Sequence, residues 1–354
     1  MNNILLNETP VRTSKNFGIN NINVDIEFPN EVKEFNNFWV ESKSKKDNVI
    51  ELDGVKDNIN LKYGTGLFDK HLFNMNKQIL IEVNSKVDNN IKLFFDFDSK
   101  NKNLFETIHI IAKENTASTI YILYKSAKNI RAFHSGVLVV DAEKNSKINV
   151  IVINMLNSNS YNFYDIQNNI DNEADVKYTI VDFGGKSSIS NLYSNLFGDE
   201  SKNTINTIYL GKDDELIDIN YIGELRGEKS NIKIEVQGAL KDRSKKHFKG
   251  TIDFKKGCRK ATGDENENCM LLSDKAKSLA LPMLLCSEED VEGNHSTSSG
   301  KVGEKELFYI MSRGFSQRDA IKLLVRAKFN SILETIKDKG IKAFILKEID
   351  ERLD

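Results

Sequence analysis

Between about Lys77 and Phe254 the chain alternates apolar and polar residues in short runs, which Asn, Asp, Gly and Ser residues separate. Alternation with a period of two is typical of β-strands that bury one face. The runs begin at Ile79, Lys92, Thr119, Gly136, Ile148, Val176, Ile205 and Ile232. We therefore expect a long series of strands here, without helices between them.

A short repeat accompanies these runs. A small residue stands after an acidic or polar turn and before a strand at Ala117, Ser146, Ala174, Ser201 and Ser230, with spacings of 27 to 29 residues. Such a period is typical of stacked units that bury a face only against their neighbours. The pattern predicts a mainly β fold with a parallel β-helix (solenoid) core. A β-sandwich, which also has regularly spaced strands, is the alternative.

The segments on either side have different patterns. The first 75 residues are mixed, and the apolar positions of Glu31–Val40, which follow Pro29, predict a short helix with Trp39 packed in the core. After Val302 the period becomes helical. We expect an N-terminal mixed segment over residues 1–75, a β-helix core over 76–302 and a C-terminal helical domain over 303–354.

Two features define the expected C-terminal helices. Ser316 can cap one helix, with Asp319 three residues later in a variant of the capping box. Gly340 is expected to end that helical unit before the last helix begins. The apolar stripe of the first helix is Ile321, Leu324, Val325, Phe329, Ile332, Leu333 and Ile336.

Composition narrows the classes of function. The 354 residues carry a formal net charge of -2, which argues against a nucleic-acid partner or an anionic membrane surface bound by bulk charge. Only three cysteines are present, too few for a disulfide framework. The N-terminus lacks the features of a signal peptide, and no apolar stretch is long enough to span a bilayer. We expect a cytoplasmic protein.

Candidate chemistry lies after the last apolar run. Cys286 ends that run, and His295 stands beside Gly293 in what we expect to be a flexible polar loop. Thiolate and imidazole groups both bind iron, and a folded-back loop could bring both to one ion. The alternatives are a buried, inert thiol and a histidine bonded to backbone. The acidic run Glu288–Glu292 is typical of a solvated face.

Two other motifs favour structural interpretations. The basic run from Lys241 to Lys249 could bind phosphate or nucleic acid, but Phe248 within it favours a solvated turn of the solenoid. The sequence Gly184-Gly185-Lys186-Ser187 lacks the first glycine of a phosphate-binding loop. We therefore expect no ATPase site in this chain, and no catalytic residue.

Several segments together resemble a known family. They are PVRT at Pro10, GALKDRSKKHFKGTIDF at Gly238, LLSDKA at Leu271, EEDVEGNH before Ser296, and LFYIMSRGFS at Leu307. In this order they are similar to the SufB/SufD family of iron-sulfur cluster assembly scaffolds. The resemblance implies a right-handed parallel β-helix and a scaffold subunit that is not an enzyme.

The resemblance also implies partners and sites. The chain would pair with a SufB-like scaffold chain, or with a second copy of itself, and would dock a SufC-like ABC ATPase. Only this ATPase, and not the chain itself, would bind ATP. His295 and Cys286 would be candidate ligands of a transient iron ion or iron-sulfur cluster shared with the partner. The ATPase would dock on Leu307, Phe308, Met311, Arg313 and Phe315. Whether flavin binds stays open.

The resemblance points to a SufD-like member, because Glu267 stands where SufB-type members carry a cysteine implied to accept sulfur, and Cys269 is offset from it. A SufB-like role remains an alternative. Two other functions also fit a β-helix: a carbohydrate-active enzyme of the pectin lyase type, and an interaction platform without metal chemistry.

Overall fold

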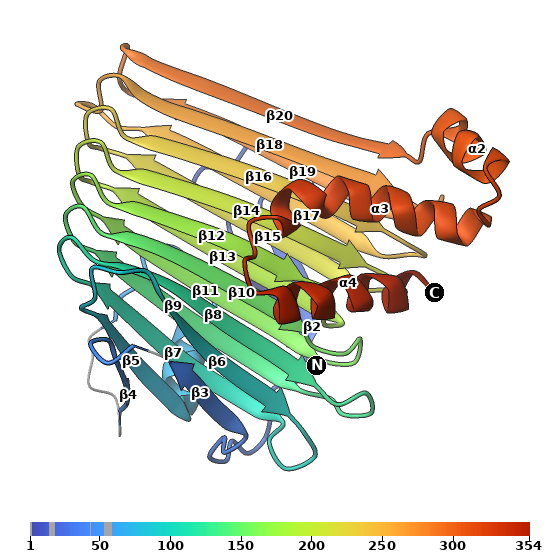
Figure 1. Cartoon of the computed structure of the whole chain (residues 1–354), viewed down its shortest axis with the longest axis horizontal. Helices are drawn as coiled ribbons and strands as arrows, with labels where there is room; N and C mark the ends of the chain where they lie inside the picture. Colours follow the sequence, from blue (N-terminus) through green and yellow to red (C-terminus); the bar gives the residue numbers. More distant parts are fainter. Residues whose placement is uncertain (1, 14–17, 43, 53–58) are drawn as a thin grey trace.

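The computed structural model describes residues 2–13, 18–42, 44–52 and 59–354. Sixteen strands between Lys77 and Lys301 form a parallel β-solenoid of eight coils, each with one strand in each of two sheets (Figure 1). The odd-numbered strands are β5 (Lys77–Val83), β7 (Asn103–Ala112), β9 (Phe133–Ala142), β11 (Tyr161–Ile170), β13 (Ser187–Leu196), β15 (Leu216–Leu225), β17 (Lys245–Phe254) and β19 (Lys277–Cys286). The even-numbered strands are β6 (Asn89–Phe97), β8 (Ala117–Ser126), β10 (Lys147–Met155), β12 (Asp175–Asp182), β14 (Lys202–Gly211), β16 (Asn231–Leu240), β18 (Ala261–Leu271) and β20 (Val291–Lys301).

The eight apolar runs of the sequence all lie in strands, which confirms the predicted solenoid. Each strand pairs in parallel with the strand two places further along the chain, so side chains stack in columns along the solenoid. Inward-facing Ile, Val, Leu, Phe and Tyr side chains fill the space between the sheets. Since successive residues point to opposite faces, one face of each sheet belongs to this core and the other is free to bind other elements.

The turns that precede the even-numbered strands explain the sequence repeat. The carbonyl groups of Thr116, Ser146, Ala174, Ser201 and Ser230 each accept a hydrogen bond from the backbone N–H of the next coil, and all five residues are buried. The predicted position of the first repeat was therefore wrong by one residue, because Thr116 and not Ala117 occupies the small-residue position of that turn. The residue before each of these five has a φ between +54° and +60°, which turns the chain sharply at this corner.

The C-terminal helices are α2 (Glu304–Ser312), α3 (Gln317–Leu333) and α4 (Lys339–Leu353). Helices α3 and α4 lie across the outer face of the even-numbered sheet (Figure 1), where Phe329 stacks on Phe183 with ring centroids 6.1 Å apart. Ser316 caps α3 by accepting a hydrogen bond from the Asp319 N–H, as predicted. Gly340 ends no helix: it lies in the first turn of α4, which Asp338 caps.

The N-terminal part contributes β1 (Asn2–Leu6), β2 (Ile22–Ile26), β3 (Phe38–Ser42), β4 (Asn48–Glu51) and α1 (Phe68–Asn74). Strands β3 and β4 pair antiparallel with β6 and β5 and cover the first coil. The predicted helix over Glu31–Val40 is wrong, because residues 31–37 are irregular and the remainder belongs to β3. Trp39 is 41% exposed and stacks on Phe94. Pairing with the open edge of β6 outweighs the local helical pattern.

Candidate functional site

The last coil of the solenoid is open to solvent. Strand β20 pairs with β18 on one side, and no strand in the described part of the chain pairs with its other side (Figure 1). Every residue from Glu292 to Lys301 is exposed. His295 lies within this strand, so the expectation of a flexible loop was wrong. The sequence here shows no alternation because neither face of β20 is buried, which removes the signal that identifies a strand.

Cys286 and His295 lie at different places in this coil. Cys286 is the last residue of β19, is exposed, and donates from Sγ to the Glu288 carbonyl oxygen at 2.9 Å. His295 is four residues into β20 from Val291, which at the rise of an extended strand is about 13 Å. The structure therefore does not bring the thiol and the imidazole to one iron ion. Among the described residues, no group of three or more His, Cys, Asp or Glu side chains is arranged to hold a metal ion.

A buried cluster of ionisable groups lies directly beneath the last coil. Glu265 is the Cα partner of His295, and Glu267 follows it on the same inner face of β18. Glu267 accepts a hydrogen bond from Tyr209 Oη at 3.0 Å and pairs with Lys246 Nζ at 2.8 Å. Burial, and then the charge of Glu267, raise the pKa of Glu265 to about 8.

The basic run of the sequence is not simply a solvated turn. Lys241, Asp242 and Arg243 form the turn, but Lys246 and Lys249 are fully buried on opposite faces of β17. Both ammonium groups are paired with carboxylates, which is how buried charge is tolerated. Sequence reasoning missed this cluster, and the available signal was that Glu265 and Glu267 share the parity of the apolar inner positions of β18.

The three cysteines differ in environment. Burial raises the pKa of the Cys258 thiol to about 11, and it also raises the pKa of Cys269. Both groups are therefore protonated near neutral pH and are poor nucleophiles. Cys286 is the one exposed cysteine of the three.

The residues expected to dock an ATPase form an exposed apolar face, which we call the α2 surface: Leu307, Phe308, Met311, Arg313 and Phe315. Phe308 is 74% exposed, Met311 and Phe315 are exposed, and Leu307 is half-buried. The Arg313 guanidinium stacks over the Tyr309 ring at 5.3 Å. None of the nine residues of α2 is buried, so this helix projects from the body of the protein next to β20 (Figure 1).

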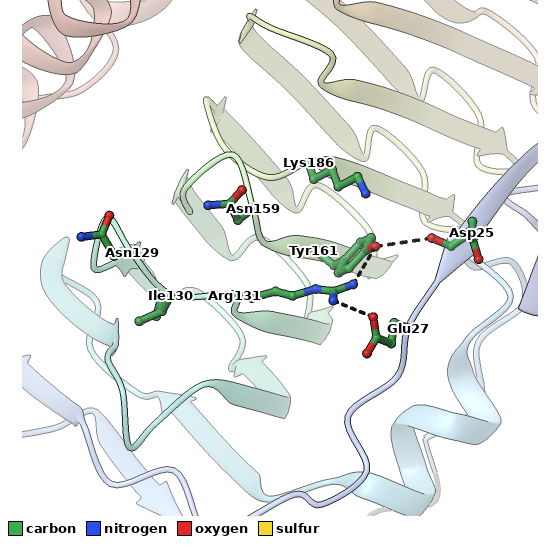
Figure 2. Close-up of a pocket in the computed structure, with 8 residues that line it drawn as sticks. All are labelled: Asp25, Glu27, Asn129, Ile130, Arg131, Asn159, Tyr161 and Lys186. Atoms are coloured by element: carbon green, nitrogen blue, oxygen red, sulfur yellow. Dashed lines mark hydrogen bonds and ion pairs between the residues drawn. The ribbon is translucent and has the colours of Figure 1, made fainter. Parts of the chain in front are cut away.

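A separate groove of about 500 Å³ lies where β2 crosses the solenoid turns (Figure 2). Arg131 donates to Glu27 at 2.6 Å and to Tyr161 Oη at 3.1 Å, and the Lys186 amine points into the groove above the Tyr161 ring. Positive and negative groups balance there. Since Lys186 precedes β13 and His295 lies three coils further on, this groove is not part of the last-coil site.

Comparison with known proteins identifies the family. The family model of the SUF system FeS cluster assembly SufBD core domain matches residues 95–328, which is about two-thirds of the chain. The chain belongs to the SufB/SufD family. The family model covers the solenoid from the end of β6 through β20 and continues into α3. The assignment therefore rests on most of the solenoid and not on one motif.

Curated relatives of this SufB/SufD-family chain include two proteins named iron-sulfur cluster assembly protein SufD. That of Bacillus subtilis is 22% identical over 78% of this chain and 63% of its own length. That of Escherichia coli is 23% identical over 69% of this chain and 58% of its own length. A SufBD family protein of Pyrococcus horikoshii is 28% identical over 73% of this chain and 58% of its own. The chain thus spans about six-tenths of these relatives. None of the helices in the described residues has the length and hydropathy needed to cross a membrane.

Proposed function

We propose that this chain is a non-catalytic, SufD-like scaffold subunit of a SUF iron-sulfur cluster assembly complex. Its last coil pairs with a SufB-like chain or with a second copy, and its α2 surface docks a SufC-like ABC ATPase. An iron ion or nascent cluster, as substrate, is held near His295 at the junction of the two scaffold chains. Family membership favours this function over a pectin lyase-like enzyme and over a platform without metal chemistry.

The observation that supports the proposal most directly is the open last coil. Strand β20 presents unpaired backbone N–H and C=O groups along one edge, together with exposed small residues from Ser296 to Gly300. An exposed strand edge is a template for pairing with a strand of another chain. A partner that paired there would cover His295 and shield it from solvent.

The ligand role fits the sparse donor set. One imidazole and one thiol, which the turn after β19 and the first four residues of β20 separate, do not complete a cluster site in one chain. Cys286 therefore serves as a candidate ligand only for an ion or cluster that spans the interface, and His295 is the primary candidate. ATP acts through the ATPase, and we assign no flavin site.

The test is anaerobic reconstitution of the complex with a SufB-like chain and a SufC-like ATPase. The two site variants are His295→Ala and Cys286→Ser. The control is Asn294→Ala, which alters the other face of β20. We expect all three variants to assemble. Cluster formation is measured by iron-sulfur charge-transfer absorption and by acid-labile sulfide. It should fall at least tenfold in His295→Ala alone, or in both His295→Ala and Cys286→Ser. Wild-type cluster yield in His295→Ala would refute the proposed role.

A further inference from the structure

Glu265 is a buried carboxylate without a hydrogen-bonding partner. Its side chain is 1% exposed, and no group in the described part of the chain bonds either Oε1 or Oε2. Across the interior stands Gly250 of β17, where a Cβ atom would collide with the Glu265 carboxylate. The carboxylate therefore spans the gap between the sheets in space that a glycine leaves open. Because burial raises its pKa to about 8, the group carries a proton near neutral pH when nothing binds it. A buried carboxyl group without any hydrogen-bonding partner is still costly, so its retention calls for a functional explanation.

The elements around Glu265 offer few groups that could satisfy it. Ile234 of β16 lies on the coil below, and Gly250 and Pro282 face it from the other sheet. These three residues have no polar side-chain atom. On its own strand the nearest inward residue is Glu267, which is already bonded by a tyrosine and a lysine and repels a second negative charge.

His295 is the remaining neighbour, and it has complementary chemistry. The register pairs its Cα atom with that of Glu265, and both side chains lie on the inner side of the even-numbered sheet. Adjacent strands are about 4.8 Å apart, so side chains at paired positions stack at this spacing. An imidazole nitrogen and a carboxylate oxygen stacked in this way can both reach one transition-metal ion at bond lengths of about 2.0–2.2 Å.

We propose that Glu265 and His295 form a two-ligand half-site for a divalent transition-metal ion, which is ferrous iron if the proposed scaffold function holds. The chain that covers the last coil supplies further ligands. The half-site gives the buried carboxyl group a positive partner and lies directly beneath the open last coil, which the partner covers. This inference deepens the proposed function and rests on it for the identity of the metal.

The donor set indicates what this chain contributes. Imidazole and carboxylate donors suit a divalent iron ion, whereas thiolates are the usual ligands of sulfide-rich clusters. Cys269 is four residues from Glu265 along β18, about 13 Å, and is protonated near neutral pH because burial raises its pKa. This chain therefore supplies ligands for iron, and the partner chain supplies the sulfur.

The test is titration of the full chain, without a histidine tag and under anaerobic conditions, with Co²⁺ as a spectroscopic probe and then Fe²⁺. We expect one ion to bind, with Co²⁺ d–d absorption typical of nitrogen and oxygen ligands. Glu265→Gln, which keeps the shape of the side chain, should weaken binding at least tenfold, as should His295→Ala. The matched control is Glu292→Gln, an exposed carboxylate on the same coil, which should bind as the wild type does. Thermal unfolding checks that each variant is folded.

The outcomes separate the two proposals. Wild-type Co²⁺ affinity in Glu265→Gln, or no binding by the wild-type chain at millimolar Co²⁺, would overturn the half-site. If His295→Ala still lowers cluster yield in the assembled complex, the proposed function survives that result. Conversely, loss of Co²⁺ binding in both variants with normal cluster yield would support the half-site and reject the proposed function.

Discussion

The ammonium group of Lys249 lies 2.6 Å from Asp218 Oδ1, and both side chains are fully buried on the outer face of the odd-numbered sheet. The N-terminal segment covers this pair. Asn7 donates from Nδ2 to Asp218 Oδ1, and its carbonyl oxygen accepts a hydrogen bond from Lys249 Nζ at 2.9 Å. Lys249 holds the pKa of Asp218 below its ordinary value, against the effect of burial. The pair therefore connects strands β15 and β17 to the start of the chain.

Replacement of Lys249 by Met should be strongly destabilising. The variant leaves the Asp218 carboxylate buried without its cation, and breaking a buried pair in this way typically costs about 3–5 kcal/mol. Urea unfolding followed by circular dichroism would measure the change. The double variant with Asp218→Asn should recover part of the loss. The exposed pair Arg243–Asp214 is the control, and Arg243→Ala should leave the urea midpoint unchanged. Equal midpoints for the two single variants would contradict the interpretation.

The stacked turns make a second prediction. A Cβ atom at Gly227 would collide with the Gly198 carbonyl oxygen of the preceding coil, because the backbones of these turns are in direct contact. Gly227→Ala should therefore lower the free energy of unfolding by about 1–3 kcal/mol, as overpacking does. At Gly300 an added Cβ atom meets nothing within 4 Å, so Gly300→Ala should have little effect. Thermal unfolding of the two variants side by side tests this, and a stable Gly227→Ala would argue against the close contact.

The α2 surface supports a third prediction. Because Phe308 and Phe315 are exposed, their replacement by Ser should not change the urea midpoint, but it should weaken capture of a SufC-like ATPase at least tenfold. Leu323→Ser, which changes an exposed apolar residue of α3 outside this surface, is the control and should bind normally. Surface plasmon resonance with immobilised ATPase measures the affinity. Equal weakening by all three variants would point to a nonspecific loss of apolar contact.

The sequence was sufficient for the scaffold and insufficient for the site, for physical reasons. The strand at Lys92 buries every second residue, so alternation reveals it, and a repeated turn reveals the stacking. The strand that carries His295 buries neither face, so its pattern is that of a loop. Lys246 and Lys249 stand in a basic segment that is typical of a solvent-exposed turn. They are buried because carboxylates on neighbouring strands pair with their ammonium groups. Pairings between coils, such as Glu265 with His295, depend on the register, which single-sequence patterns do not specify.

The last prediction concerns pH and Asp165 of β11. This carboxylate is buried and accepts hydrogen bonds from the Thr65 N–H at 2.6 Å and from Thr65 Oγ1 at 3.0 Å. Burial outweighs these bonds and raises the pKa of Asp165 from its ordinary value of 3.8 to about 7. Between about pH 4 and 7 the folded protein thus retains a proton that the unfolded chain has released, so the contribution of Asp165 to stability falls as the pH rises through this window.

Asp165→Asn removes this titration and keeps the size of the side chain. The free energy of unfolding of the variant minus that of the wild type should therefore rise between pH 4 and 7, with a slope of at most about 1.4 kcal/mol per pH unit, and should be constant above pH 8. Urea unfolding at one-unit intervals of pH measures the difference. The same subtraction for Asp264→Asn, which changes an exposed carboxylate of β18, is the control. A flat difference for Asp165→Asn would mean that the carboxyl group has the same pKa in the folded and unfolded states, as a hydrated group would, and would contradict its burial against Thr65.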